Sequence, residues 1–146
     1  MRVTLSKGKE DKATISFLRS HSIAALATID PDGSPSVATI YYTCLKPPEI
    51  LFITKSETAK RINILNNSQI ALAISEEKQL TTLQLKGVAE EVREPKVIDK
   101  VFDNITLESA HPDHWPPPII KMHQGSFVVL RITPTIMKLS DYRHFS

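Results

Sequence analysis

The feature that most constrains this chain is a series of short apolar runs separated by turn residues. The first two runs, residues 23–29 and 36–43, flank Asp30-Pro31-Asp32-Gly33. In that turn, proline presets its own φ and glycine is free to take a positive φ. This arrangement predicts an antiparallel β-hairpin. Further strands are predicted over residues 50–54, 70–75, 81–92 and 126–133, with residues 135–139 continuing the last strand beyond a kink at Pro134. Gly87, inside the run 81–92, is expected to mark a bulge or a close approach.

Short helices are predicted between these strands. One covers residues 11–20, and a second begins at Ser56 as N-cap and carries Ala59, Ile62 and Leu65 as its apolar face until Asn66-Asn67 ends it. A third opens at Glu94-Pro95, where the missing N–H of proline costs little. Six short strands bury their apolar faces best by curling into a barrel. The fold class predicted is therefore mainly β with short helices, a six-stranded antiparallel β-barrel rather than a parallel sheet.

Length and composition describe one ordinary globular domain. The 146 residues are 41% hydrophobic and 23% charged, which is enough for one real core, so a single domain over residues 1–146 is expected. Residues 1–10 are polar and are expected to form a flexible N-terminal segment. No run is apolar enough for a signal peptide or a membrane span, and Cys44 is the single cysteine. We expect a cytoplasmic protein that binds no membrane.

Several function classes are disfavoured by the residues themselves. The formal net charge is only +2 and the basic residues alternate with acids, so a nucleic-acid interface is not expected. The four glycines build neither a dinucleotide-binding turn nor a P-loop nor a nucleophile elbow. His111, Asp113, His114 and His123 have spacings that could chelate zinc, but a tight site needs three or four well-placed ligands. A solvent-facing, proline-stiffened loop is the favoured interpretation, and no metal is predicted.

The most informative segment is residues 50–61, in which a strand, a polar loop and a helix start follow one another. The first turn of a helix offers free N–H groups and a partial positive charge, which together favour an anion. Lys55 and Lys60 bracket this turn, and Thr54, Ser56 and Thr58 add hydroxyl groups. A phosphate site is one interpretation of the pattern. A capped helix with surface lysines is the other.

The order of several motifs resembles that of the pyridoxamine 5′-phosphate oxidase-like family. The resemblance covers roughly residues 11–142, and its pieces are individually weak but specific in their order. They are residues 23–28, 32–35, 38–42, 52–54, 58–60, 66–72, 85–90 and 129–134. Membership implies a split-barrel fold and a homodimer with flavin mononucleotide (FMN) in two clefts between the subunits.

The resemblance also implies cofactor-binding residues. Thr39, Ile40 and Tyr41 would lie along the flavin ring, and Ile53 and Thr54 would offer backbone and hydroxyl contacts. Thr58, Ala59 and Lys60 would hold the phosphate, with Lys55 as a further cation, and Thr82 would contact the flavin from a later strand. Trp115 is a weaker candidate for a ring neighbour. No catalytic residue is identified: His21 and His123 are candidate bases by residue type alone, and a structural role is favoured for both.

Departures from the family pattern bear on activity. Ala38 and Ala59 stand where the oxidase has arginines, Thr43 replaces a lysine and Thr82 a glutamine, and neither Arg143 nor His144 aligns with the C-terminal substrate residues. We therefore expect an FMN-dependent oxidoreductase for an unidentified small substrate rather than a true pyridoxamine phosphate oxidase. Alternatives are a non-catalytic flavin-binding or stress- or redox-response protein, or a relative that binds a deazaflavin or haem. Haem would require an axial ligand such as His111, His114 or His123.

Overall fold

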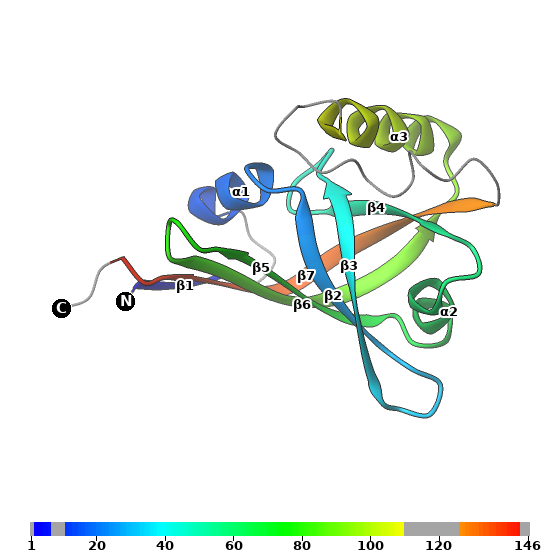
Figure 1. The fold of residues 1–146 in the computed structure, drawn as a ribbon, viewed down its shortest axis with the longest axis horizontal. Helices are drawn as coiled ribbons and strands as arrows, with labels where there is room; N and C mark the ends of the chain where they lie inside the picture. The colour runs from blue at the N-terminus through cyan, green and yellow to red at the C-terminus, as the bar shows by residue number, and fades with distance from the viewer. Residues whose placement is uncertain (1, 7–10, 110–125, 144–146) are drawn as a thin grey trace.

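A computed structural model describes residues 2–6, 11–109 and 126–143 (Figure 1). The strands are β1 (Arg2–Ser6), β2 (Ile23–Ile29), β3 (Pro35–Thr43), β4 (Ile50–Lys55), β5 (Gln69–Glu76), β6 (Thr81–Val92) and β7 (Phe127–Asp141). The helices are α1 (Lys12–Arg19), α2 (Ala59–Asn66) and α3 (Pro95–Ser109). Every predicted strand is present, and the two predicted C-terminal segments form one continuous strand, β7.

Six of the strands form a closed antiparallel barrel in the order β7-β4-β3-β2-β5-β6, with β6 pairing again to β7. This confirms the predicted fold class. The additional strand, β1, pairs with the second half of β7 outside this ring. The prediction of a flexible N-terminus is thus wrong for Arg2–Ser6. The alternation of Val3 and Leu5 is too short to mark a strand by itself, and β1 depends on the free edge of β7.

The core lies inside the barrel, where successive residues of each strand point alternately inward and outward. Along β5 and β6 the buried residues alternate with more exposed ones almost without interruption. Strand β4 is buried on both faces, because Ile50 and Phe52 enter the barrel core while Leu51 packs into a second cluster with α3. Figure 1 shows α3 lying over this end of the barrel.

Two glycines fix the backbone at special points. Gly33 has a φ of 90° in the β2–β3 turn, as its place in the predicted hairpin requires. Gly87 marks a shift in register between β6 and β7 at Lys86/Gly87, which confirms the expected bulge or close approach. A Cβ at Gly87 would overlap the carbonyl oxygen of Thr133 and lie 2.9 Å from the Cα of Pro134. Only glycine allows this crossing of the two backbones.

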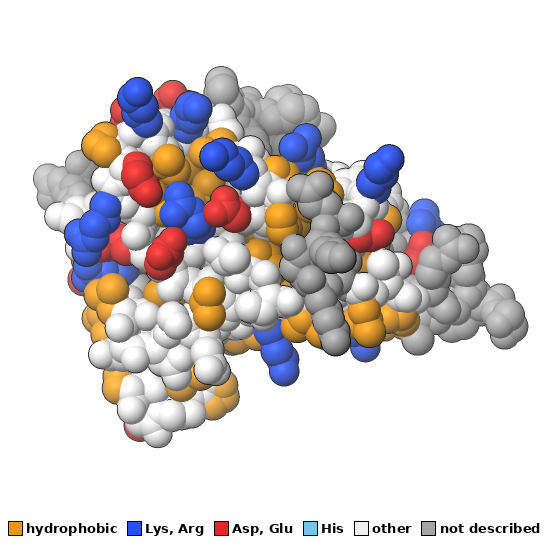
Figure 2. Space-filling model, turned by 180° about the vertical axis from the view of Figure 1, so that it is seen from behind, with side chains coloured by type: hydrophobic (Ala, Val, Ile, Leu, Met, Phe, Trp, Pro, Cys, Tyr) orange, Lys and Arg blue, Asp and Glu red, His pale blue; other side chains and the backbone are white. Residues whose placement is uncertain are grey.

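Charged side chains of both signs are interspersed on the surface that Figure 2 shows. One ion-pair cluster of the molecule has Arg131 at its centre, within 4.0 Å of Glu49, Glu90 and Glu94. The guanidinium is therefore balanced by carboxylates from three segments. Within the described ranges, no helix is long and apolar enough to cross a membrane.

Candidate functional site

The barrel has its shortest pairing where β3 meets β4, and we call this junction the open seam. Its paired residues are limited to Tyr42 with Phe52 and Thr43 with Leu51. Beyond them, β3 continues its pairing with β2 while β4 continues along β7. Figure 1 shows β4 running away from β3 at a wide angle toward α2. The segments 39–41 and 53–55 therefore flank a gap in the sheet rather than pair with each other.

The start of α2 lies at the end of this gap. Thr58 is the N-cap residue, rather than the predicted Ser56, and its side chain makes no capping hydrogen bond. The Thr58 hydroxyl instead donates to the carbonyl oxygen of Lys55 at 3.0 Å, so it accepts the hydroxyl of Thr54 at 2.9 Å. The backbone N–H groups of residues 59–61 consequently have no hydrogen-bond partner in the described part of the chain. Free amides at a helix start are what an anion requires.

Lys60 supplies an uncompensated positive charge beside these amides. Its side chain is half-buried, and burial lowers the pKa of Lys60 below the ordinary lysine value. None of the carboxylates in the described ranges forms an ion pair with it, although its sequence neighbour Arg61 has such a partner in Glu91. A desolvated ammonium group without a counter-ion favours the binding of an anion.

Helix α2 is anchored by Asn63, a residue that sequence reasoning missed. The Asn63 side chain is 2% exposed and donates to Thr28 Oγ1 at 3.0 Å and to Asp30 Oδ1 at 2.7 Å. These contacts fix the helix against the end of β2. They also turn the predicted apolar face outward, since Ile62 and Leu65 are 43% and 54% exposed. The helix ends where predicted, and its C-cap residue Asn67 has an extended backbone.

The predicted cofactor residues fall into two groups. Nine of them line the open seam or the start of α2, namely Thr39, Ile40, Tyr41, Ile53, Thr54, Lys55, Thr58, Ala59 and Lys60. Ile40 belongs to the barrel core, so it can offer a ligand only its backbone. Thr82 is not brought to this group. It pairs with Ser75 and Ser140 beside the β5–β6 turn.

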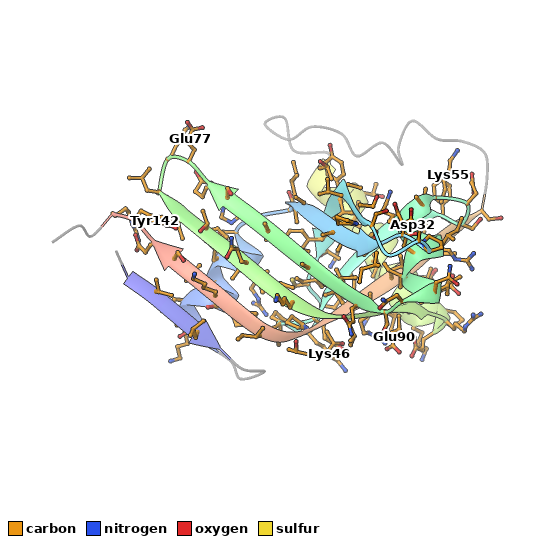
Figure 3. The ribbon with its side chains drawn as sticks, turned by 90° about the horizontal axis from the view of Figure 1, so that it is seen from below. Asp32, Lys46, Lys55, Glu77, Glu90 and Tyr142 are labelled. Carbon is orange, nitrogen blue, oxygen red and sulfur yellow. The ribbon has the colours of Figure 1, made fainter. Side chains whose placement is uncertain are left out.

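Figure 3 makes the separation visible. Glu77 and Tyr142 mark the end of the molecule where Thr82 lies, and Lys55 and Asp32 mark the opposite end. The backbone N–H of Tyr142 donates to the carbonyl oxygen of Leu80, which ties the β5–β6 turn to the end of β7. One chain by itself therefore cannot place Thr82 beside the start of α2.

Of the five histidines, His21 is the one that lies among the described residues. His111, His114 and His123, together with Asp113, Trp115 and His144, lie outside the described residues. His21 stacks on Phe17 with ring centroids 4.2 Å apart, and its Nε2 lies 3.0 Å from Glu76 Oε2. Its other nitrogen lies 2.8 Å from the carbonyl oxygen of Phe17. His21 thus joins α1 to β5, and among the described residues no cluster of three metal-ligating side chains occurs.

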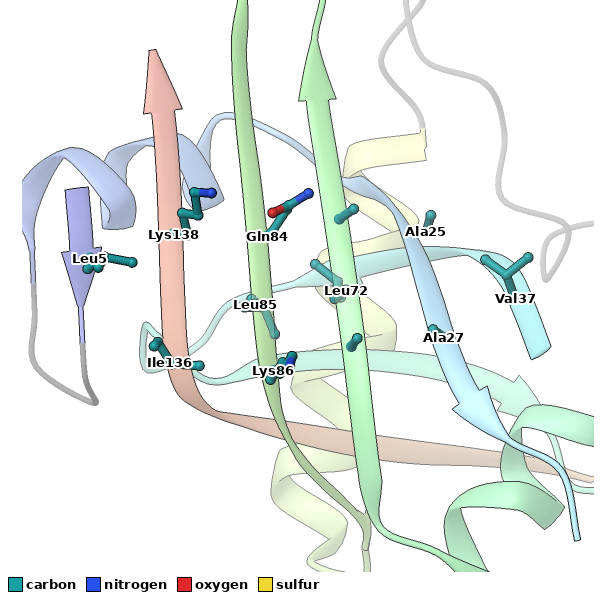
Figure 4. A pocket seen from close by; sticks show the side chains of 12 residues that line it. Leu5, Ala25, Ala27, Val37, Leu72, Gln84, Leu85, Lys86, Ile136 and Lys138 are labelled. Carbon is teal, nitrogen blue, oxygen red and sulfur yellow. The ribbon is translucent and has the colours of Figure 1, made fainter. Parts of the chain in front are cut away.

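A shallow apolar groove of about 470 Å³ crosses the outer face of the barrel (Figure 4). Alanines 25, 27, 71 and 73 form its floor on β2 and β5. Val37 and Leu5 stand at its margins and are 73% and 62% exposed. A contiguous apolar surface of this kind is typical of a binding face.

Comparisons with known proteins agree with this architecture. A family model described as pyridoxamine 5′-phosphate oxidase matches residues 11–140. A pyridoxine/pyridoxamine 5′-phosphate oxidase from Erythrobacter litoralis is 32% identical over 99 residues, covering 68% of this chain and 46% of that protein. The chain spans about half the length of the curated relatives it matches.

Solved structures show the same fold. A conserved hypothetical protein from Mycobacterium tuberculosis has a TM-score of 0.71 at 23% identity, over 94% of this chain and 92% of its own. An F420 reductase has a TM-score of 0.67 at 21% identity, over 88% of this chain and 97% of its own. With the family model matching most of the sequence, the chain belongs to the pyridoxamine 5′-phosphate oxidase family and has its split-barrel fold.

Proposed function

We propose that this protein binds FMN in the open seam and acts as an oxidoreductase on a small substrate that the sequence does not identify. The observation that carries the proposal is the start of α2, where unpartnered amides of residues 59–61 adjoin the half-buried Lys60. Such a cradle suits the phosphate of FMN because amides and ammonium can all donate to its oxygens.

The residues along the open seam fit the flavin ring. Thr39 and Tyr41 on β3, and Ile53 on β4, are only partly covered or exposed, and their strands share no paired residues toward Lys55. Backbone groups left out of a ladder can bond the polar edge of a ring, while the side chains cover its faces. When bound, FMN supplies the electron-transfer chemistry, and these residues orient it and limit its contact with water.

A second copy of the chain completes the proposed site. Thr82 is remote from α2 within one chain, and it lies on the same outer face as the apolar groove. We propose a homodimer that buries this groove and brings Thr82 of one subunit toward the seam of the other. Val37→Glu would place a charge in the groove and is expected to yield a folded monomer in sedimentation velocity. A dimer that persists would remove the groove from the interface.

The first test is the visible spectrum of the purified protein after FMN is added and the excess removed. Retention near one FMN per chain is expected, and riboflavin, which lacks the phosphate, is expected to bind at least tenfold more weakly. Lys60→Met should lower FMN affinity by about tenfold, the scale of one charge-assisted hydrogen bond. It should leave riboflavin affinity unchanged. Equal affinity of the wild type for FMN and riboflavin would contradict the phosphate cradle.

The same titration separates the alternatives. Deazaflavin F420 or haem bound in preference to FMN would assign the protein to another cofactor. If FMN binds, reduction by NADH or NADPH and reoxidation are then compared with the rates of free FMN. Rates no greater than those of free FMN would favour a non-catalytic flavin-binding or redox-response protein.

A further inference from the structure

Arg61 follows Lys60 in the sequence but has a different environment. Its Nη2 donates to Glu91 Oε1 on β6 at 3.2 Å, and its Nη1 donates to the carbonyl oxygen of Ser56 at 3.3 Å. The side chains of Arg61 and Glu91 are 26% and 10% exposed. Arg61 is therefore a largely buried, charge-balanced bridge from α2 to both β6 and the turn before the helix.

We propose that Arg61 is a positioning residue that fixes the turn of residues 55–58. Glu91 holds the Arg61 side chain in place, and the fixed turn preorganises the start of α2 for a phosphate. The effect on phosphate binding rests on the proposed function. The contacts of Arg61 with Glu91 and Ser56 are present in the protein without a ligand. The guanidinium group suits this task because its planar fork can bond two differently placed acceptors at once.

The hydroxyl groups of Thr54 and Thr58 restrain this turn from within, and two backbone hydrogen bonds do so as well. The Ser56 N–H donates to the carbonyl oxygen of Ser126 at 3.0 Å, and the Thr58 N–H donates to that of Lys55 at 3.3 Å. Arg61 adds a hydrogen bond to the carbonyl oxygen of Ser56. A site that binds through backbone amides depends on a supporting shell that holds those amides in place before the ligand arrives.

The competing interpretation is that Arg61 itself binds the phosphate. It would then take the role of the arginine that the oxidase has at the position of Ala59. Its Nε is buried and has no hydrogen-bond partner among the residues described, so one donor is unsatisfied. The two interpretations differ in the role of Glu91. For a positioning residue, Glu91 supports binding. For a direct ligand, Glu91 competes with the phosphate for the same cation.

Two variants, Arg61→Met and Glu91→Gln, separate these roles. Arg61→Met keeps much of the stem but removes both hydrogen bonds, and Glu91→Gln removes the charge that holds the guanidinium. Both are expected to lower FMN affinity, Arg61→Met by about tenfold, with riboflavin affinity unchanged. Arg93→Met is the matched control, because Arg93 also pairs with Glu91 but its side chain is 82% exposed. This control should bind FMN like the wild type.

Hydrogen exchange of the ligand-free protein provides the second readout. Faster exchange at Ser56 and Thr58 in Arg61→Met, with the midpoint of urea unfolding little changed, is expected. Unchanged exchange, or FMN affinity that stays the same or rises in Glu91→Gln, would overturn the proposal. If the wild type fails to distinguish FMN from riboflavin, the proposed function fails instead, while the exchange rates still decide whether Arg61 holds the turn.

Discussion

The two seams of the barrel differ in how completely they are paired. Between β6 and β7, twelve residue pairs form a ladder along the whole of β6, interrupted only by the register shift at Gly87. Between β3 and β4 there are two pairs, and the strands then separate. The closed seam supplies backbone pairing for the fold, and the open seam leaves backbone and side chains accessible to a ligand. Stability and binding are thus expected to respond to different substitutions.

The largest effect is expected from Gly87→Ala in the closed seam. The added Cβ would overlap the carbonyl oxygen of Thr133, a backbone atom that can move only if the β6–β7 ladder shifts. We expect the free energy of unfolding to fall by about 3 kcal/mol, the upper part of the usual range for overpacking. Urea unfolding followed by circular dichroism measures it.

Lys86→Ala is the control for that change, because Lys86 precedes Gly87 in the same strand but is exposed. Its effect should stay within about 0.5 kcal/mol. If Gly87→Ala were equally mild, the close approach of β6 and β7 would not constrain this position. FMN affinity of the folded Gly87→Ala protein should equal that of the wild type.

The next effect is expected from Asn63→Leu beside the open seam. Leucine has a similar volume, but it removes both donors and leaves the buried Thr28 hydroxyl and the Asp30 carboxylate without this partner. Unfolding free energy should fall by about 2 kcal/mol, and FMN affinity should fall as well because α2 loses its anchor. Asn66→Ala, at the exposed end of the same helix, should change neither quantity appreciably. Loss of stability with normal FMN affinity would show that the anchoring of α2 by Asn63 is not needed for FMN binding.

Asn63 also shows what the sequence could and could not predict. Local signals were sufficient for the six barrel strands, the Gly33 turn, the Gly87 irregularity and the α3 start at Pro95, because each depends on neighbouring residues. The inward face of α2 was predicted wrongly because hydrophobic periodicity favoured Ile62 over Asn63. The buried amide is satisfied by Thr28 and Asp30, residues more than thirty positions away.

The candidate site was predictable to a similar extent. The strand–turn–helix order of residues 50–61 placed Lys60 beside a helix start without any knowledge of the barrel. The separation of Thr82 from that helix depends on strand order around the ring, which no local pattern carries. The pairing of β1 with β7 likewise depends on distant residues, because β1 pairs with residues 137–141 of β7 beyond the part that pairs with β4.

The smallest and most specific effect concerns the charge of Lys60 and pH. Burial lowers the pKa of Lys60 below the ordinary value of 10.5, so the folded protein releases this proton at a lower pH than the unfolded chain. Between the two pKa values the unfolded chain binds more protons, and the contribution of Lys60 to stability therefore rises with pH. A bound phosphate has the opposite influence, because it favours the charged ammonium group.

FMN affinity should accordingly fall as pH rises through the lowered pKa of Lys60, by up to about tenfold if the ammonium contributes one charge-assisted hydrogen bond. Fluorescence titrations between neutral and alkaline pH measure this, with Lys60→Met as the reference in which that decline should be absent. Riboflavin affinity should not follow the same profile, because riboflavin has no phosphate group for Lys60 to contact. A decline of equal size in Lys60→Met would assign the titration to another group and leave the half-buried lysine as a structural residue of the open seam.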